Sequence, residues 1–205
     1  MLKKLSIILI FIAATHYTII HTTPHKLGPG TFAPSEPQQT RITDPKSFIV
    51  KKQRITPLAH YKITAKVLSK KNYYFDRESI LSPTDLALGW GRMSDESIIE
   101  SIHISQSGRW FRWHAEKLPI SKKEIQNHSC NTHILPANKS VRTTLKKIRK
   151  GDIIQLEGKL IKATNPSGGE WISSLSRTDS GAHACEVVWV ESLKIIPPVQ
   201  SLPTH

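Results

Sequence analysis

The fold class depends most on residues 140–161, which read SVRTTLKKIRKGDIIQLEGKLI. The first half predicts a helix over residues 140–150, because valine, leucine and isoleucine recur at i, i+4 and i+7. Gly151 ends that helix. The second half predicts a long apolar strand, and Gly158 inside it indicates a bulge or a bend. An amphipathic helix therefore leads directly into a bent strand.

The segments on either side are read as short strands and helical turns. We expect an irregular stretch from Glu116 to Ala137 and a hairpin at Gly168-Gly169. The other expected elements are a strand over 60–69, a short helix opened by Ser82-Pro83, a helical turn at Ser94, strands near 102–104 and 110–113, and a last strand over 185–196. This order predicts an α+β fold, a small antiparallel β-barrel or sheet that is OB-like, with one packed amphipathic helix. The alternative is an open antiparallel sheet with the helix on one face.

The beginning of the chain predicts export from the cell interior. Lys3 and Lys4 precede a largely apolar run over residues 5–14, in which Ser6 is the one polar residue, and this pattern is typical of an export signal. Two readings stay open, a cleaved signal peptide and an uncleaved membrane anchor with a transmembrane helix. The predicted organisation is a signal peptide or anchor over 1–24, a Pro-rich linker over 25–45, one globular domain over 46–196 and a flexible tail over 197–205.

The chain is strongly basic, with a formal net charge of +13. Such a field attracts anionic partners such as lipid head groups, glycans or nucleic acid, although it also serves solubility. One basic cluster lies on the helix predicted over 140–150, opposite its apolar stripe. Its members, expected to contact an anion or a lipid, are Arg142, Lys146, Lys147, Arg149 and Lys150.

The two cysteines, Cys130 and Cys185, predict a disulfide, because an even count in an oxidising compartment favours one. The alternative is a pair of buried thiols. The nearby histidines do not match a standard zinc spacing, so no metal site is assigned.

The richest polar and aromatic cluster is residues 109–114, RWFRWH, where an arginine beside an aromatic ring suits a planar or sugar-ring ligand. Further candidates lie in segments expected to be loops or turns. The candidate ligand-binding residues are Trp90, Arg109, Trp110, Asn131, His133, Arg177 and Asp179. No catalytic residue is assigned, because no recognisable catalytic motif is present.

Several motifs together resemble a family of uncharacterised bacterial exported or membrane-anchored proteins. These motifs are LSPTDLALGWGRMSD (81–95), SQSGRW (105–110), HILPAN (133–138) and SSLSRTDSG (173–181). The resemblance spans about residues 54–195 and implies a leader followed by one domain, without an assigned reaction. It places the protein in the bacterial cell envelope, either in the periplasm or tethered to the inner membrane through residues 5–20.

The favoured hypothesis is a non-enzymatic envelope protein that binds an anionic surface, an anionic polymer or an envelope protein, without a cofactor. The first alternative is a periplasmic hydrolase that uses His133, Asn131, Arg177 and Asp179. The second alternative is an OB-like nucleic-acid-binding protein that stacks bases on its tryptophans.

Overall fold

A computed structural model of the 205-residue chain describes residues 23–176 and 185–197. Strands dominate it. They are β1 (Gln38–Arg41), β2 (Phe48–Val50), β3 (Gln53–Asn72), β4 (Thr84–Gly89), β5 (His103–Ser107), β6 (Trp110–His114), β7 (Ser129–Pro136), β8 (Ile153–Thr164), β9 (Glu170–Ile172) and β10 (Glu186–Ile196). The helices are α2 (Glu96–Ile99), α3 (Lys122–Asn127) and α4 (Lys139–Lys147), with single 3₁₀ turns at η1 (Arg77–Ile80) and η2 (Gly91–Ser94).

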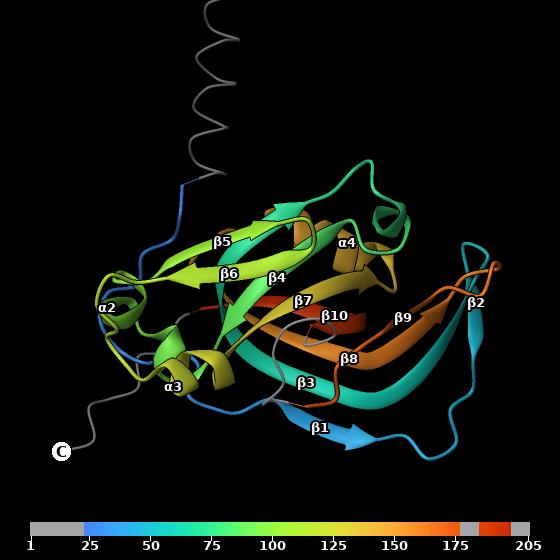
Figure 1. Ribbon diagram of the computed structural model, residues 1–205, viewed down its shortest axis with the longest axis horizontal. Helices are drawn as coiled ribbons and strands as arrows, with labels where there is room; N and C mark the ends of the chain where they lie inside the picture. Colours follow the sequence, from blue (N-terminus) through green and yellow to red (C-terminus); the bar gives the residue numbers. More distant parts are fainter. Residues whose placement is uncertain (1–22, 177–184, 198–205) are drawn as a thin grey trace, which may run out of the picture.

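Within the described residues, most strands form one large, strongly curved sheet (Figure 1). Its hydrogen-bonded order is β1-β3-β4-β7-β10-β8-β9, and β2 pairs with β3. The long strand β3 also pairs with β8, from Arg54 opposite Thr164 to Lys66 opposite Ile153. All of these pairings are antiparallel except that of β7 with β10. The strands β5 and β6 form a separate hairpin.

The helix α4 packs its apolar stripe against the main hydrophobic cluster, as the sequence pattern predicts. Val141, Leu145 and Ile148 are buried in that cluster with residues of β3, β4, β7, β8 and β10. The side chain of Asn138 caps the helix by accepting a hydrogen bond from the amide of Val141. The lysines and arginines of α4 therefore face away from the core.

Gly158 lies opposite a register shift of β10, so the irregularity is in the neighbouring strand and not in β8, where it was expected. The register of β10 shifts between Val190 and Ser192, opposite Gly158 and Glu157. A Cβ atom on Gly158 would lie 2.1 Å from the carbonyl oxygen of Trp189. Only glycine lets the backbones of β8 and β10 approach this closely.

The hairpin β5–β6 covers the opposite side of β3 and β4 together with α2 and α3 (Figure 1). Leu68 of β3 and Ala87 of β4 supply the floor of this second cluster. Ile104, Phe111 and Trp113 of the hairpin pack on it with their partly buried side chains. The remaining hairpin residues alternate toward solvent, as a two-stranded ribbon requires.

Residues 23–37, called the N-terminal strap below, run along the domain. Phe32 and Ala33 are buried, and the carbonyl of Ala33 accepts a hydrogen bond from the amide of Gly91. The amide of His25 donates to the carbonyl of Lys150 at 2.7 Å. The stretch expected as a linker, 25–45, thus contains most of the strap and all of β1, while the domain boundaries stay a prediction.

Two secondary-structure predictions are wrong. The helix expected from Ser82-Pro83 is strand β4, because its side chains are buried on both faces and tertiary packing outweighs the capping pattern. The irregular stretch expected from Glu116 to Ala137 contains α3 and the fully buried strand β7. The sequence pattern did not indicate a strand here, because β7 contains asparagine, threonine and histidine and polar residues rarely occupy a buried strand.

The predicted disulfide is wrong, because Cys130 and Cys185 do not form one. Alternation along β7 points Cys130 into the main cluster, whereas Cys185 lies against Asn131 on the other side of the strand. The prediction of a transmembrane helix is also not upheld. Within residues 23–176 and 185–197, every helix is too short or too polar to cross a bilayer. The apolar segment 5–20 and the predicted tail beyond residue 197 lie outside the described residues.

The fold class is confirmed at its coarser level. The protein is α+β, rich in strands that form a large, mainly antiparallel sheet, with one packed amphipathic helix. The finer expectation, a small OB-like barrel or sheet, is not confirmed.

Candidate functional site

A buried polar cluster lies on the side of β4 and β7 that faces away from the main core. Asp85 of β4 stands directly opposite His133 of β7 in the register of the two strands. Both residues are almost fully buried, and Nδ1 of His133 lies 2.9 Å from Oδ1 of Asp85. This contact has ion-pair distance but not hydrogen-bond alignment. The ring of His133 also packs against Trp171, with centroids 4.8 Å apart.

Arg109 enters this cluster from the tip of the β5–β6 hairpin. Gly108 and Arg109 have φ values of 55° and 68°, the left-handed conformation that a two-residue type I′ turn requires at both positions. Arg109 is unusual there, since residues with a Cβ disfavour this region. Its guanidinium donates to Oδ1 of Asp85 at 2.8 Å and to both carboxylate oxygens of Asp76 at 2.7 and 2.9 Å.

The same guanidinium also stacks on the ring of Tyr73, 3.8 Å from its centroid. The hydroxyl of Tyr73 accepts a hydrogen bond from the amide of Arg109 at 3.2 Å. Tyr73 and Asp76 belong to the connection between β3 and β4, residues 73–83. The hairpin tip is therefore locked to that connection and to β4 at once.

The charges of this network shift the proton affinities of its members. The hydrogen bonds from Arg109 hold the pKa of Asp76 below its ordinary value of 3.8. Burial alone would lower the pKa of Arg109, but the hydrogen bond to Asp76 and the charge of Asp85 raise it. Burial and the charge of Asp85 raise the pKa of Tyr73. Each shift favours the form that keeps the ion pairs intact.

Asn131 extends the cluster along β7. Its amide nitrogen donates to the carbonyl of Arg109 at 3.1 Å, and its oxygen accepts from Nε2 of Gln106 at 2.7 Å. The structure thus brings together three residues predicted from sequence, Arg109, Asn131 and His133. Sequence reasoning missed Asp85. The available signal was a lone carboxylate between Thr84 and the apolar run LALGW.

The network acts as a structural brace, meaning that its ion pairs hold the hairpin tip against β4 and the β3–β4 connection, and its groups are not arranged as a reactive centre. Arg109 is shared by two carboxylates, and Asp85 is fully buried beneath it. Within the described residues, Oδ2 of Asp85 has no hydrogen-bond partner. Arg177 and Asp179, predicted for the same site, lie outside the described residues.

Trp90 does not belong to this cluster. Its indole is buried in the main core, and Nε1 donates to Oε2 of Glu36 at 2.7 Å. The ring of His128 meets it edge-on, and Nε2 of His128 pairs with Oε1 of Glu36 at 3.0 Å. Trp90 therefore fastens the N-terminal strap and does not line the polar cluster.

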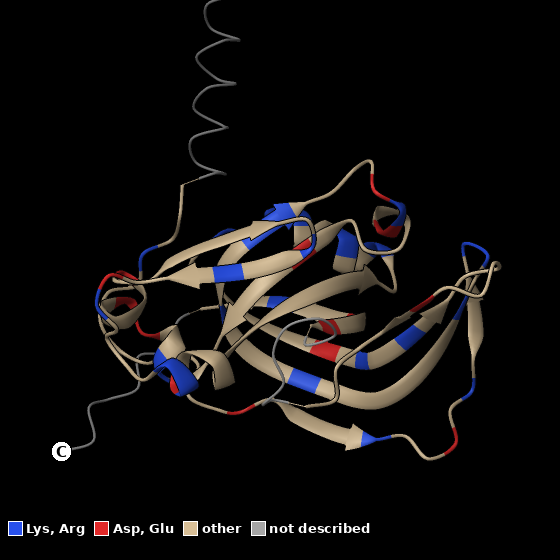
Figure 2. Ribbon diagram, viewed as in Figure 1, with Lys and Arg blue, Asp and Glu red and all other residues tan. Residues whose placement is uncertain are grey.

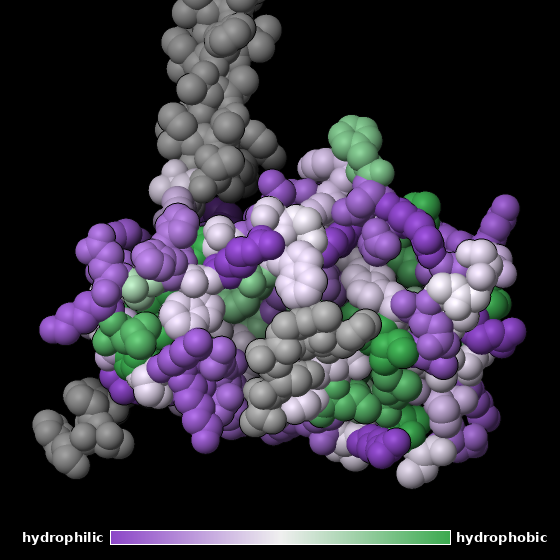
Figure 3. All heavy atoms as spheres, viewed as in Figure 1, coloured by the Kyte–Doolittle hydropathy of each residue, from purple (hydrophilic) through white to green (hydrophobic). Residues whose placement is uncertain are grey.

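Exposed aromatic side chains stand around the locked hairpin tip. Phe75 is 99% exposed and Tyr74 is 73% exposed in the β3–β4 connection, and Trp110 of β6 is 42% exposed. Exposed basic residues flank them. Arg112 shares the outward face of β6 with Trp110, and Arg77 begins η1. The name aromatic–basic surface is used below for Tyr74, Phe75, Arg77, Trp110 and Arg112. Figure 3 shows that hydrophobic and strongly hydrophilic side chains alternate on this face of the molecule.

The predicted anion-contact residues of α4 lie mainly in solvent. Arg142, Lys146, Lys147 and Lys150 are exposed, and Arg149 is half-buried near Asp152. Lys70 of β3 connects this basic face to the sheet, because Nζ donates to the carbonyls of Leu145 and Ile148 at 2.6 and 2.9 Å. In Figure 2 the ribbon is blue at basic residues of β3, α4, η1 and β6, and the whole chain has 29 lysines and arginines against 16 acidic residues.

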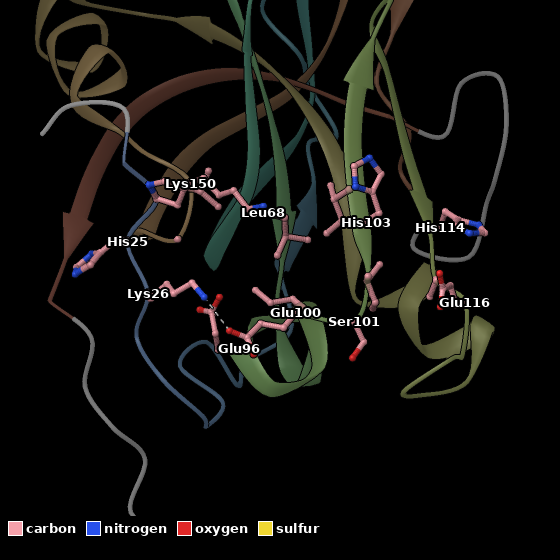
Figure 4. A pocket seen from close by; sticks show the side chains of 17 residues that line it. His25, Lys26, Leu68, Glu96, Glu100, Ser101, His103, His114, Glu116 and Lys150 are labelled. Atoms are coloured by element: carbon pink, nitrogen blue, oxygen red, sulfur yellow. Dashed lines mark hydrogen bonds and ion pairs between the residues drawn. The ribbon is translucent and has the colours of Figure 1, made fainter. Parts of the chain in front are cut away.

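A pocket lies elsewhere in the described residues, at the base of the hairpin and not at its tip. It has a volume of about 540 Å³ and lies between the N-terminal strap, α2 and the β5–β6 hairpin (Figure 4). Its polar lining includes His25, Lys26, Glu96, Glu100, His103, His114, Glu116 and Lys150. Within residues 23–176 and 185–197, no three His, Cys, Asp or Glu side chains are grouped as a metal ion would require.

Comparison with protein-family models and with curated proteins finds no match for this chain. The family resemblance of the sequence motifs therefore stays a prediction. Function has to be argued from the geometry alone.

Proposed function

We propose that this chain is a non-enzymatic, exported protein of the bacterial cell envelope that binds an anionic polymer. Export rests on the basic and apolar start of the sequence. The binding function rests on the domain. We further propose that its five central strands, β3, β4, β7, β8 and β10, follow an OB-type arrangement.

The strand pairings support this arrangement. The strands β3, β4 and β7 are consecutive antiparallel neighbours in the large sheet. The next two central strands pair in crossed order, since β10 lies beside β7 and β8 joins β10 to β3. The helix α4 occupies the connection between β7 and β8. An OB-fold is a five-stranded, partly open Greek-key barrel, and this order agrees with it.

An OB-type arrangement gives an expected binding face. Such domains bind oligonucleotides and oligosaccharides on the face of strands two and three and on the loops after strands one and four. By analogy these are β4, β7, the β3–β4 connection and the segment after β8. The buried polar cluster lies on that face, and Arg109 ties the hairpin tip to it. In this proposal, the cluster braces the binding face.

The observation that carries the proposal is the aromatic–basic surface. Phe75 is almost fully solvated, although burying an aromatic side chain would stabilise the fold. Phe75 precedes Asp76, which is paired with Arg109 and hydrogen-bonded to Ser79. These contacts fix the loop, so the fold holds the exposed ring of Phe75 at a defined place. Exposed rings stack on bases or sugars, and Arg77 and Arg112 offer charges to phosphate, sulfate or carboxylate groups.

Hydrolysis is less well supported. The pair Asp85–His133 superficially matches an acid and a base, but Arg109 neutralises Asp85 and Trp171 packs on the histidine ring. A general base needs a reachable reacting proton. Within the described residues, no serine, threonine or cysteine side chain is hydrogen-bonded to the ring of His133, so no nucleophile is placed beside it.

The experiment is an anisotropy titration of two fluorescent anionic polymers, heparin and an oligothymidylate, at low and at high salt. Binding is expected to weaken steeply with salt, because charged contacts release counterions. Phe75→Ala and Trp110→Ala should each weaken binding of the oligothymidylate by about 1–3 kcal/mol, the usual contribution of one stacked ring. Arg112→Gln should reduce the salt dependence for both polymers.

Leu118→Ala and Lys122→Gln are matched controls, because both side chains are exposed outside the aromatic–basic surface. They should leave both affinities unchanged. Binding that ignores salt, or that the controls weaken as much as the surface variants do, would contradict the proposal. If the protein binds heparin but not the oligothymidylate, and Phe75→Ala does not change heparin binding, the proposed charged contacts stand and the proposed ring stacking is contradicted.

A further inference from the structure

We infer that the pocket at the base of the β5–β6 hairpin is a second binding site, for a small amphiphilic anion. Its ligand has a carboxylate, phosphate or sulfonate group on an apolar body. This site is separate from the aromatic–basic surface, because it lies at the opposite end of the hairpin. Its volume of about 540 Å³ falls within the range of small-molecule sites.

The inner wall of the pocket is apolar and comes from three elements. Leu68 of β3, Ile99 of α2 and Ile102 line it, and all three belong to the hydrophobic cluster beneath the hairpin. Ile104 of β5 is partly buried and adds to the same wall. Apolar side chains that face a cavity offer a surface for a hydrocarbon or aromatic body.

Among the charged side chains around this wall, Lys150 on the strap side is the cation that could pair with a ligand. Two of the lining carboxylates are already paired, Glu96 with Lys66 and Glu100 with Lys26. Lys150 makes no ion pair within the described residues, and it lies on the wall formed by the strap and the α4–β8 turn (Figure 4). An anionic group at Lys150 would therefore gain a charge-assisted contact without breaking an existing pair.

The opposite wall has weaker charge. His103 of β5 and His114 of β6 stand directly opposite one another in the hairpin register. Glu116 lies beyond them at the far rim (Figure 4). This order, a lysine at one wall, an apolar centre and a carboxylate at the far rim, orients an amphiphilic anion with its head toward Lys150.

The N-terminal strap completes the site. Pro24, His25 and Lys26 form its outer wall, and the amide of His25 is bonded to the carbonyl of Lys150 at 2.7 Å. The ring nitrogen Nδ1 of His25 lies 3.3 Å from Oδ1 of the buried Asp152. The pocket therefore exists only while the strap is docked.

The test uses anilinonaphthalene sulfonate, a fluorescent amphiphilic anion, and follows its displacement from the full chain by decanoate. We expect saturable binding of the dye to the folded protein and displacement by decanoate. Acetate lacks the apolar body, and decanol and decylamine lack the anion, so all three should fail. Lys150→Gln should weaken dye binding about tenfold, the loss expected for one charge-assisted contact.

Lys147→Gln is the matched control, since it removes an equivalent exposed lysine from α4 outside the pocket. Glu116→Gln should leave the affinity unchanged or raise it, because it removes the carboxylate at the far rim. Cooperative urea unfolding of each variant excludes dye binding to a misfolded state. The inference is overturned by absent dye binding, by equal binding to Lys150→Gln and Lys147→Gln, or by displacement with decanol and decylamine.

Discussion

At the residue scale, Asp85 joins two residues that were singled out from sequence, Arg109 and His133. It is fully buried and contacts an arginine from the hairpin tip and a histidine from the neighbouring strand. A buried carboxylate is costly to desolvate unless it is paired. Asp85 is therefore one of the side chains that hold the hairpin tip in place, together with Asp76, Tyr73 and Asn131.

We predict that Asp85→Asn lowers the free energy of unfolding by about 3 kcal/mol, the low end for breaking a buried ion pair. The loss stays at that end because Arg109 keeps its contacts with Asp76. Urea denaturation at neutral pH measures it. Asp44→Asn changes an exposed carboxylate and should have almost no effect. Equal stability of the two variants would show that the network is not a brace.

Asp76 predicts a dependence of stability on acid. Its pKa is lower in the folded protein than the ordinary 3.8, mainly through hydrogen bonds from Arg109. A carboxylate with a depressed pKa adds stability above its unfolded pKa and loses it as the pH falls through the folded pKa. Wild-type protein should therefore lose more stability than Asp76→Asn on acidification from pH about 5 to about 3. Parallel acid profiles in urea denaturation would contradict this assignment.

At the scale of elements, part of the fold could be predicted and part could not. The apolar stripe of α4 follows from local spacing and is present, whereas the irregularity expected at Gly158 lies in the neighbouring strand β10. The strands β4 and β7 do not follow from local spacing, because their buried faces carry polar residues. Asp85, Asn131 and His133 find their partners far away in sequence, and local patterns contain no information on those contacts.

The candidate site was predicted in a similar, partial way. The motif RWFRWH identified Arg109 and Trp110, and both lie at the hairpin tip, one buried against β4 and one exposed. Trp90 was a candidate ligand-binding residue, yet it is a core residue that binds the strap. The chemistry of individual residues thus pointed to several correct candidates. Which of them lie together could be seen only from the fold.

We predict that Gly158→Ala lowers the free energy of unfolding by at least about 2 kcal/mol, the scale of overpacking against backbone. Its Cβ would lie 2.1 Å from the carbonyl oxygen of Trp189. Gly169→Ala is the control, because its Cβ would meet the movable side-chain end of Asn165. Thermal unfolding should separate the two variants clearly. A Gly158→Ala protein as stable as the control would mean that β8 and β10 are not held this closely.

At the scale of the whole molecule, the N-terminal strap packs along the domain and borders one of the two proposed sites. It is hydrogen-bonded to Trp90 in the core, to η2 through Ala33 and to the carbonyl of Lys150 in the α4–β8 turn. The large pocket is bounded by this strap, whereas the aromatic–basic surface is not. Releasing the strap should therefore affect the two sites differently.

Gly151→Ala tests this separation. An added Cβ would lie 1.7 Å from the carbonyl oxygen of His25, so the start of the strap should be displaced. Gly168→Ala has the same kind of backbone strain, φ +87 against +94, but nothing within 4 Å of the added atom. Limited proteolysis with mass spectrometry should show faster cleavage within residues 23–37 in Gly151→Ala alone. Equal cleavage rates would place the strap elsewhere.

The central claim is that anionic polymers bind at the aromatic–basic surface. Hydrogen–deuterium exchange with and without saturating oligothymidylate tests it most directly, because it maps protection along the chain. We predict protection in peptides that cover residues 70–80 and 105–114, and unchanged exchange in β2 and β9. Protection confined to other segments, or no protection although the polymer is bound, would contradict the account.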